Sequence, residues 1–387
     1  MKRITYCLLA IIATTCNVSY CFSQNQARPT ASDNIPEAYT HSVDSLSWYI
    51  DAHFDTDRQK AETIYAWITN NLTYNVYTTF TSRNEVYSEE RDLQRTLQSR
   101  KGICKQFALL FRTLAENVGI PAFVVSGYNK SNGTLLPTPH EWCAAKVDGQ
   151  WFFYDPTFGM GYVTNNYQFV HRPTMKYCQV SPEKMIRTHM PYDPIWQLLP
   201  SPCTYDEFDK NTYNPPHTAK NKYDFNDSIL VYVQQPRIQQ LTSSYLRARH
   251  NGTANPLVDY YLQLTQSNIN VYKQKQVYEI YLKAMKLYNQ STDLHNEFIR
   301  LRRQKFRTEK NEETVKGWLH DALLLANRAD SLLSNVQEAP PQYESAVRNL
   351  QASTQTLAEK LGKMQEFAEL YYASSSKDRK KLLEELK

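Results

Sequence analysis

The chain has little glycine and little cysteine. Glycine contributes only 10 of 387 residues, which argues against a fold assembled mainly from glycine-dependent turns and loops. Four of the seven cysteines lie between residues 104 and 203, which is too sparse for a disulfide scaffold. The sequence has no Cys-x-x-Cys pair, and His171, His189 and His217 are spread without ligand spacing. We therefore predict neither a metal site nor a cofactor.

Strong charge of one sign is also lacking. The formal net charge is +5, and Lys2 and Arg3 belong to a segment that we expect to be removed. The remaining chain is only mildly basic, so a nucleic-acid or acidic-membrane partner is not predicted. Beyond the N-terminal segment, no apolar run approaches the length of a membrane span.

The N-terminus resembles a secretory signal. Lys2 and Arg3 precede an apolar run at residues 4–15, and residues 21–23 place small side chains at the cleavage positions. The run is too short to span a bilayer. We expect an extracytoplasmic protein, secreted or periplasmic.

Lipid attachment at Cys16 or Cys21 is the alternative to ordinary cleavage. Thr15 and Tyr20 precede these cysteines and fit a lipid-attachment signal poorly. Ordinary cleavage is therefore favoured, and membrane association is expected only if the chain is lipidated.

A length of 387 residues exceeds what one compact core usually holds. We predict the following organisation: signal peptide 1–23, disordered lead 24–40, catalytic core 41–165, irregular wrapping segment 166–224 and helical bundle 225–387.

The predicted core begins with helices. Apolar spacing and capping residues indicate helices over 42–54 and 56–72, and Leu93 and Leu97 suggest another short one. A longer amphipathic helix is predicted over 104–118, with Gly119 and Pro121 preventing its continuation.

A strand over residues 122–128 follows, and then a β-hairpin. Residues 141–147 and 150–155 are predicted to form its two strands. Asp148-Gly149 joins them and is the dipeptide that best fits a two-residue type I′ turn.

The hairpin predicts which side chains share a face. If Val147 opposes Gln150, then Trp142 opposes Asp155 and His140 opposes Thr157. His140 and Asp155 are then diagonal neighbours, about 7–8 Å apart between backbones. Cys143 points to the opposite face and is not expected to take part in catalysis.

These positions suit a cysteine nucleophile. Cys104 opens the amphipathic helix, where the helix dipole and a nearby imidazolium favour the thiolate. His140 would move the proton, and Asp155 would hold the imidazole ring in the useful tautomer. The backbone N–H of Cys104 is a candidate oxyanion donor. Each residue alone more often has a structural role, but the helix start, the hairpin face and the export signal are independent features that together favour catalysis.

The stretch 101–159 resembles the transglutaminase-like superfamily, as an exported bacterial-type member. The resemblance rests on Gly-Ile-Cys before an apolar helix, His-Glu-Trp at 140–142, Asp-Gly-Gln-Trp at 148–151 and Tyr-Asp-Pro-Thr at 154–157. Residues 61–68 and 72–74 look like the helix that precedes the core in many members. The resemblance covers about 55–165.

The resemblance implies an α+β, papain-like core in which the nucleophile helix packs on an antiparallel sheet. It also implies the triad Cys104, His140 and Asp155. Gln106 departs from the small residue found two positions after the cysteine in many members, and would either narrow the substrate cleft or supply a hydrogen bond. A second oxyanion donor is not assigned, because Gln98 and Trp67 are better explained as a surface residue and a packing aromatic.

Four cysteines follow the leader, and for two of them the sequence allows two alternatives. Cys178 and Cys203 either form a bridge or are buried thiols that act as small apolar side chains.

The last third is predicted to be a coiled-coil-like helical bundle. Two heptad seams, separated by Pro340-Pro341, indicate an antiparallel pair joined by an earlier helix through Tyr278, Leu282 and Met285. The first seam comprises Trp318, Ala322, Leu325, Ala329, Leu332 and Val336; the second comprises Val347, Leu350, Thr354, Leu357, Leu361, Met364, Ala368 and Tyr371. We expect scaffold packing; binding of a protein partner is the alternative.

Two classes of function follow from the sequence. One is a thiol enzyme that acts on amide bonds of a peptide or protein through a thioester, with hydrolysis favoured over transfer to an amine. The other is a non-catalytic envelope protein that uses the core as a scaffold.

Overall fold

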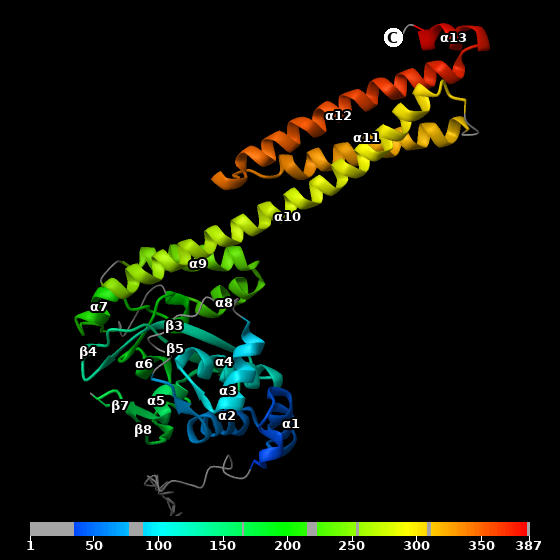
Figure 1. Ribbon diagram of the computed structural model, residues 1–387. Helices are drawn as coiled ribbons and strands as arrows, with labels where there is room; N and C mark the ends of the chain where they lie inside the picture. Colours follow the sequence, from blue (N-terminus) through cyan, green and yellow to red (C-terminus); the bar gives the residue numbers. More distant parts are fainter. Residues whose placement is uncertain are drawn as a thin grey trace, which may run out of the picture. The chain divides into compact units, whose positions relative to one another are not determined.

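The computed structural model describes residues 35–76, 88–164, 166–214, 223–252, 255–307 and 311–384. The expected signal peptide and residues 24–34 of the expected lead lie outside these ranges. The chain divides into two compact units: residues up to Val125 together with 140–185, and residues 126–139 together with 186–387. Figure 1 shows the elements of both units in chain order.

The first unit begins with helices at the predicted places. They are α1 (Val43–His53), α2 (Asp57–Asn71), α3 (Glu89–Ser99) and α4 (Cys104–Asn117). The side chain of Ser42 caps α1, and Thr56 and Gln59 form a capping box at α2. Residues 37–39, expected within a disordered lead, instead form the 3₁₀ helix η2 (Glu37–Tyr39). The adjacent Thr40 is held by the guanidinium of Arg100, 2.5 Å from its hydroxyl.

The predicted hairpin is present in this unit. Strands β5 (His140–Val147) and β6 (Gln150–Tyr154) pair antiparallel, with Val147 opposite Gln150. Asp148 and Gly149 both have positive φ, 50° and 78°, as a type I′ turn requires.

The hairpin ladder is shorter than predicted. Its last pair is Cys143 with Tyr154, so the expected pairs Trp142–Asp155 and His140–Thr157 do not form. Asp155 instead becomes the N-cap of the short helix α5 (Pro156–Met160). Pro156 explains the change, because it has no N–H for the ladder and suits the first position of a helix.

A single apolar core holds this unit together. Helix α4 contributes a face that is completely buried, and α2 covers it with an aromatic and aliphatic face. The first residues of strand β3 (Ala122–Ser131) lie beside β5, where the Lys146 N–H donates to the Pro121 carbonyl at 2.9 Å. The principal buried side chains are Ile64, Trp67, Ile68, Phe107, Leu110, Phe111, Leu114, Cys143 and Tyr154.

Short elements complete the first unit. They are β1 (Thr73–Tyr74), β2 (Lys101–Gly102), β7 (Gly161–Val163), β8 (Phe169–His171), η4 (Met175–Tyr177) and α6 (Pro182–Met185). The predicted wrapping segment therefore contains regular elements, which its composition of proline, tyrosine and asparagine did not indicate.

The second unit contains the remainder of β3. There Gly127–Asn129 pair antiparallel with β9 (His189–Pro191), and Lys130 and Ser131 pair with β4 (Thr134–Leu135). The elements η5 (Pro194–Gln197) and α7 (Tyr205–Asp209) follow. Their apolar core is built from Tyr128, Ile186, Met190, Tyr192, Leu199, Cys203, Tyr205, Phe208 and Val258.

The rest of the second unit is helical. The helices are α8 (Phe225–Gln234), α9 (Arg237–His250), α10 (Pro256–Arg303), α11 (Glu312–Ser334), α12 (Pro341–Ala373) and α13 (Ser376–Glu384). Helices α10, α11 and α12 pack along one another. Helices α11 and α12 are antiparallel, since Gln351 and Gln355 of α12 donate to Ser334 and Asp330 of α11.

The two predicted heptad seams agree with the structure to different extents. The seam on α12 is confirmed, because each of its residues is buried or packs against a buried cluster. By the same criterion, four residues of the first seam are confirmed: Ala322 and Ala329 are buried, and Leu332 and Val336 pack against a buried cluster. Trp318 and Leu325 are half-buried, whereas their neighbours Leu319 and Ala326 are buried. Because α11 contacts both α10 and α12, it buries a broader face than a two-helix seam. On α10, Tyr278 and Leu282 were predicted to face the bundle but are exposed.

Cys104, Cys143, Cys178 and Cys203 are all free thiols. The bridge between Cys178 and Cys203, one of the two alternatives for these residues, is therefore absent. In the described part of the chain, no helix combines the length and apolar character needed to cross a membrane.

Candidate active site

Two short strands fix the start of the helix that carries Cys104. Tyr74 of β1 lies opposite Gly102 of β2 in a parallel pair, and the Asn75 N–H donates to the Gly102 carbonyl at 2.7 Å. A Cβ atom at residue 102 would lie 2.9 Å from Cε1 of Phe107. Glycine therefore allows the backbone to approach the helix, and Cys104 follows as the first residue of α4.

The departure at Gln106 has a structural explanation. Its Oε1 accepts a hydrogen bond from the Ile103 N–H at 3.1 Å, and its Nε2 donates to Asp92 of α3 at 3.4 Å. Ile103 has no side-chain oxygen with which to cap α4. Of the two alternatives, Gln106 thus supplies a hydrogen bond, and this bond holds the helix start beside Cys104.

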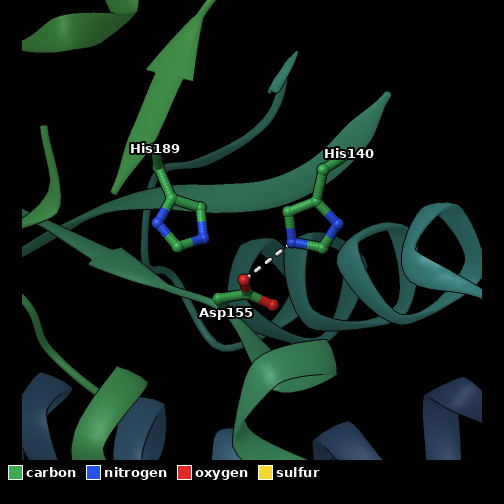
Figure 2. Close-up of side chains that lie close together, drawn as sticks. All are labelled: His140, Asp155 and His189. Atoms are coloured by element: carbon green, nitrogen blue, oxygen red, sulfur yellow. Dashed lines mark hydrogen bonds and ion pairs between the residues drawn. The ribbon is translucent and has the colours of Figure 1, made fainter. Parts of the chain in front are cut away.

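His140 and Asp155 meet in the interior of the first unit. Nε2 of His140 lies 2.7 Å from Oδ2 of Asp155, and both side chains are buried. Figure 2 shows the ring and the carboxylate turned toward each other. The other carboxylate oxygen, Oδ1, accepts from the Phe158 N–H at 3.0 Å. Asp155 is thereby fixed by the helix that it caps.

Aromatic rings enclose the imidazole. The ring of Phe158 stands edge-on to His140 at 5.0 Å, and that of Trp142 is stacked at 5.8 Å between centroids. These rings were not identified from the sequence. The pair Asp155-Pro156 is the sequence signal that could have identified Phe158. A capping residue followed by proline begins a helix, and the third residue of that helix then lies over the cap.

His140 has an altered proton affinity. Burial alone would lower its pKa, but the charge and hydrogen bond of Asp155, with a further hydrogen bond to the Cys104 side chain, raise the pKa of His140 to about 10. The imidazolium form is therefore stabilised at neutral pH. With Nε2 turned to Asp155, Nδ1 remains for the thiol. The structure thus brings together the three residues that the sequence singled out.

The other thiols of the first unit have different surroundings. Cys143 is buried and donates to the Ala108 carbonyl of α4 at 3.1 Å. Burial raises the pKa of Cys143 and of Cys178, so both favour the neutral thiol. Cys104 is half-buried and is the cysteine hydrogen-bonded to His140.

The two residues considered as second oxyanion donors occupy other environments. Trp67 is buried, with the Arg100 guanidinium 5.0 Å from its ring centroid. Gln98 is exposed on α3. These environments agree with the predicted roles of Trp67 as a packing aromatic and of Gln98 as a surface residue.

The third side chain drawn in Figure 2, His189, belongs to β9 of the second unit. It is buried, and its Nδ1 lies 2.8 Å from the Thr188 hydroxyl.

Part of the chain is similar to known proteins. The family model of the transglutaminase-like superfamily matches residues 44–156. Human kyphoscoliosis peptidase is 28% identical over 178 residues, which cover 42% of this chain and 25% of the relative. The mouse protein has the same identity and coverage. The match thus spans about a quarter of the length of these relatives.

Solved structures give two partial matches. A candidate cysteine protease from Cytophaga hutchinsonii is 25% identical over 32% of this chain and 40% of its own, with a TM-score of 0.25. A structure described as a TGase is 17% identical over 55% of this chain and 52% of its own, with a TM-score of 0.26.

Proposed function

We propose that the chain is a thiol enzyme that cleaves amide bonds in peptides or proteins, and the match of residues 44–156 to the family model of the transglutaminase-like superfamily supports this proposal. The observation that carries the proposal is the arrangement of Cys104, His140 and Asp155. The thiol and the imidazole are hydrogen-bonded, and the imidazole is 2.7 Å from a buried carboxylate.

The geometry supports acyl transfer in two stages. The Cys104 thiol gives its proton to Nδ1 of His140, and the sulfur attacks the carbonyl carbon of the substrate. His140 then returns the proton to the leaving amine as the C–N bond breaks, which leaves a thioester on Cys104. Asp155 keeps the proton of Nε2 directed toward itself throughout and stabilises the imidazolium.

The second stage sets hydrolysis apart from transfer. In hydrolysis, water gives a proton to His140 and attacks the thioester carbonyl, and the proton returns to the departing sulfur. In transfer, an amine takes the place of water. Hydrolysis is favoured because the related human and mouse proteins are named as peptidases.

The test is alkylation of the full chain with iodoacetamide across pH, followed by mass spectrometry at each cysteine. At neutral and mildly acidic pH, Cys104 should react faster than a free thiol, and His140→Ala should abolish this advantage. Cys178→Ala serves as the matched control and should leave Cys104 unaffected. A Cys104 that reacts as a free thiol in both proteins would overturn the proposal.

The product then distinguishes the two reactions. A peptide library incubated with the protein should gain water at the cleaved bond in hydrolysis, whereas added alkylamine should appear in the product in transfer. Cys104→Ala should abolish either product.

We also propose an extracytoplasmic location, which rests on the residues of the N-terminal segment. Fractionation of cells that express the full chain, compared with a chain lacking residues 1–23, tests the proposal. Recovery of both proteins from the cytoplasm would contradict it.

A further inference from the structure

Tyr65 of α2 has a buried hydroxyl group that the proposed reaction does not use. Its side chain is completely buried, and the hydroxyl donates a hydrogen bond to the Thr174 carbonyl at 2.9 Å. The Tyr177 backbone N–H donates to the same phenol oxygen. Burial above all, and then the nearby Cys178 and Asp155, raise the pKa of Tyr65 well above its ordinary value. The phenol therefore stays protonated and acts as a donor.

The segment that Tyr65 holds is also bonded to the helix that Asp155 caps. The Thr174 N–H donates to the Gly159 carbonyl of α5 at 2.8 Å. The Asp155 N–H donates to the Tyr177 carbonyl at 2.9 Å. Residues 174–177, which comprise η4 and its cap, are therefore bonded both to Tyr65 and to α5, at the N-cap and near the C-terminal end of that helix.

Gly159 allows α5 to lie directly against the phenol. A Cβ atom at residue 159 would overlap the Tyr65 hydroxyl oxygen, and it would lie 2.6 Å from Cζ of Tyr65 and 3.0 Å from Cγ2 of Thr69. Only glycine permits so close an approach of the backbone. Tyr65 thus supports α5 by direct contact as well as through η4.

The position of α5 determines where the Asp155 carboxylate lies. Oδ1 of Asp155 accepts from the Phe158 N–H at 3.0 Å, and Oδ2 is 2.7 Å from the imidazole of His140 (Figure 2). The ring of Phe158 stands edge-on to His140 at 5.0 Å. The same ring lies 5.4 Å from that of Tyr177 in η4. A displacement of η4 or α5 therefore moves both the carboxylate and the ring that contact the imidazole.

We propose that Tyr65 is a positioning residue of the site: its hydroxyl fixes η4, and η4 together with α5 holds the Asp155 carboxylate against His140. This role rests on the proposed function, because it concerns the orientation of the triad. The hydroxyl acts through backbone groups of residues 174 and 177. Its loss should therefore affect the orientation of the triad and not the binding of substrate.

Tyr65→Phe removes the hydroxyl and keeps the buried ring. NMR titration of the His140 imidazole, assigned by its absence from His140→Gln, measures the effect on the site without any substrate. The pKa of His140 is about 10 in the wild type. In Tyr65→Phe it should fall by about one pH unit, because the charged hydrogen bond to Asp155 is weakened. A His140 that titrates as in the wild type would overturn the proposal.

Tyr154→Phe is the matched control. Tyr154 is also completely buried and immediately precedes Asp155, but its hydroxyl has no hydrogen-bond partner among the described residues. Its loss should leave the pKa of His140 unchanged. An equal fall in both variants would show a general effect of removing a buried hydroxyl and would contradict the role of Tyr65.

Gly159→Ala tests the contact between α5 and the phenol. The added methyl group overlaps the Tyr65 hydroxyl oxygen, so α5 must move while the hydroxyl is retained. The pKa of His140 should fall in the same direction as in Tyr65→Phe. A pKa equal to that of the wild type would show that α5 does not determine the position of the carboxylate, and the proposal would be wrong.

A double-mutant cycle with Asp155→Asn tests the route of the effect. Tyr65→Phe should slow labelling of Cys104 by iodoacetamide at pH 7 by up to about tenfold in the wild-type background. In the Asp155→Asn background it should slow labelling much less, because the carboxylate through which Tyr65 acts is absent. Equal slowing in both backgrounds would show a different route and overturn the proposal.

Peptide cleavage separates this role from the proposed function. In Tyr65→Phe, kcat should fall in the same proportion as the labelling rate, and KM should stay unchanged. A rise in KM with unchanged kcat would place Tyr65 in substrate binding and contradict the proposal. A protein that cleaves no peptide, but whose His140 responds to Tyr65→Phe as expected, would overturn the proposed function and support the positioning of Asp155 by Tyr65.

Discussion

Asp155 holds His140 with one carboxylate oxygen and the start of α5 with the other. Oδ2 is 2.7 Å from the imidazole Nε2, and Oδ1 accepts from the Phe158 N–H at 3.0 Å. The charge of this side chain and its ability to cap a helix can therefore be separated by substitution.

Asp155→Asn should keep the cap and lose the charge. The amide oxygen can still accept from the Phe158 N–H, but the imidazolium loses its partner and the pKa of His140 falls. Any amide-cleaving activity should decrease by roughly 10² to 10⁴-fold, and the variant should lose the stability that the raised pKa of His140 contributes at neutral pH. Asp155→Ala should in addition cost about 1 kcal/mol of unfolding free energy through the lost cap. Activity assays and urea unfolding of both variants test this expectation, and equal stability of the two would contradict it.

The stability of the chain should fall with pH because of His140. The folded pKa is raised from 6.5 to about 10, so between these values the folded state binds more protons than the unfolded state. The contribution of His140 is complete below about pH 6.5 and is lost as the pH rises to 10. The slope is at most about 1.4 kcal/mol per pH unit for one proton.

Urea unfolding of the wild type and of His140→Gln from pH 6 to 10 measures this contribution. The difference in unfolding free energy between the two should shrink as the pH rises. A difference that stays constant across the range would show that His140 does not carry the extra proton.

Gln106 should support the reactivity of Cys104 without contacting the substrate. Gln106→Ala leaves the Ile103 N–H without its acceptor, which should lower the unfolding free energy by about 1 kcal/mol and slow alkylation of Cys104 by loosening the helix start. Gln106→Glu retains an acceptor and should restore the alkylation rate, although not the bond to Asp92. Slow alkylation in both variants would show that the bond to Ile103 is unimportant for the thiol.

Gly102→Ala should destabilise the first unit. The added methyl group would lie 2.9 Å from the ring of Phe107 and 3.1 Å from Cβ of Gln106, and Phe107 is buried. Overpacking of this kind costs about 1–3 kcal/mol. Gly362→Ala in α12 is the control, because a Cβ atom there meets nothing within 4 Å and alanine should stabilise the helix by up to about 1 kcal/mol. Thermal unfolding of the two variants should therefore shift in opposite directions.

The sequence predicted the local parts of the site correctly. The capping residues gave α1 and α2, and Asp148-Gly149 gave the hairpin and its register. The proximity of His140 and Asp155 was expected from a longer ladder, but it arises because Asp155 leaves the strand to cap α5. Pro156 was the sequence signal for this departure from the strand, because proline has no N–H to donate to a strand ladder.

Features that depend on distant segments could not be predicted. The seam predicted on α11 missed Leu319 and Ala326, because the helix contacts both α10 and α12 and buries a broader face than one heptad seam describes. Tyr278 and Leu282 are exposed although the neighbouring Val277 and Ala284 are buried against α11 and α12, so the side of α10 that meets the bundle differs from the predicted one. The hydrogen bond from Gln106 to Asp92 joins α4 to α3. No local sequence pattern predicts how these two helices lie relative to each other.

Strand β3 belongs to both units: residues up to Val125 lie in the first and residues from Ser126 in the second. The segment that matches the superfamily, 44–156, contains this transition. Excising that segment would strip Gly127–Asn129 of their partners in β9 and leave an open strand edge prone to aggregation. We therefore expect segment 44–156 to be less stable and more prone to aggregation when excised than within the full chain.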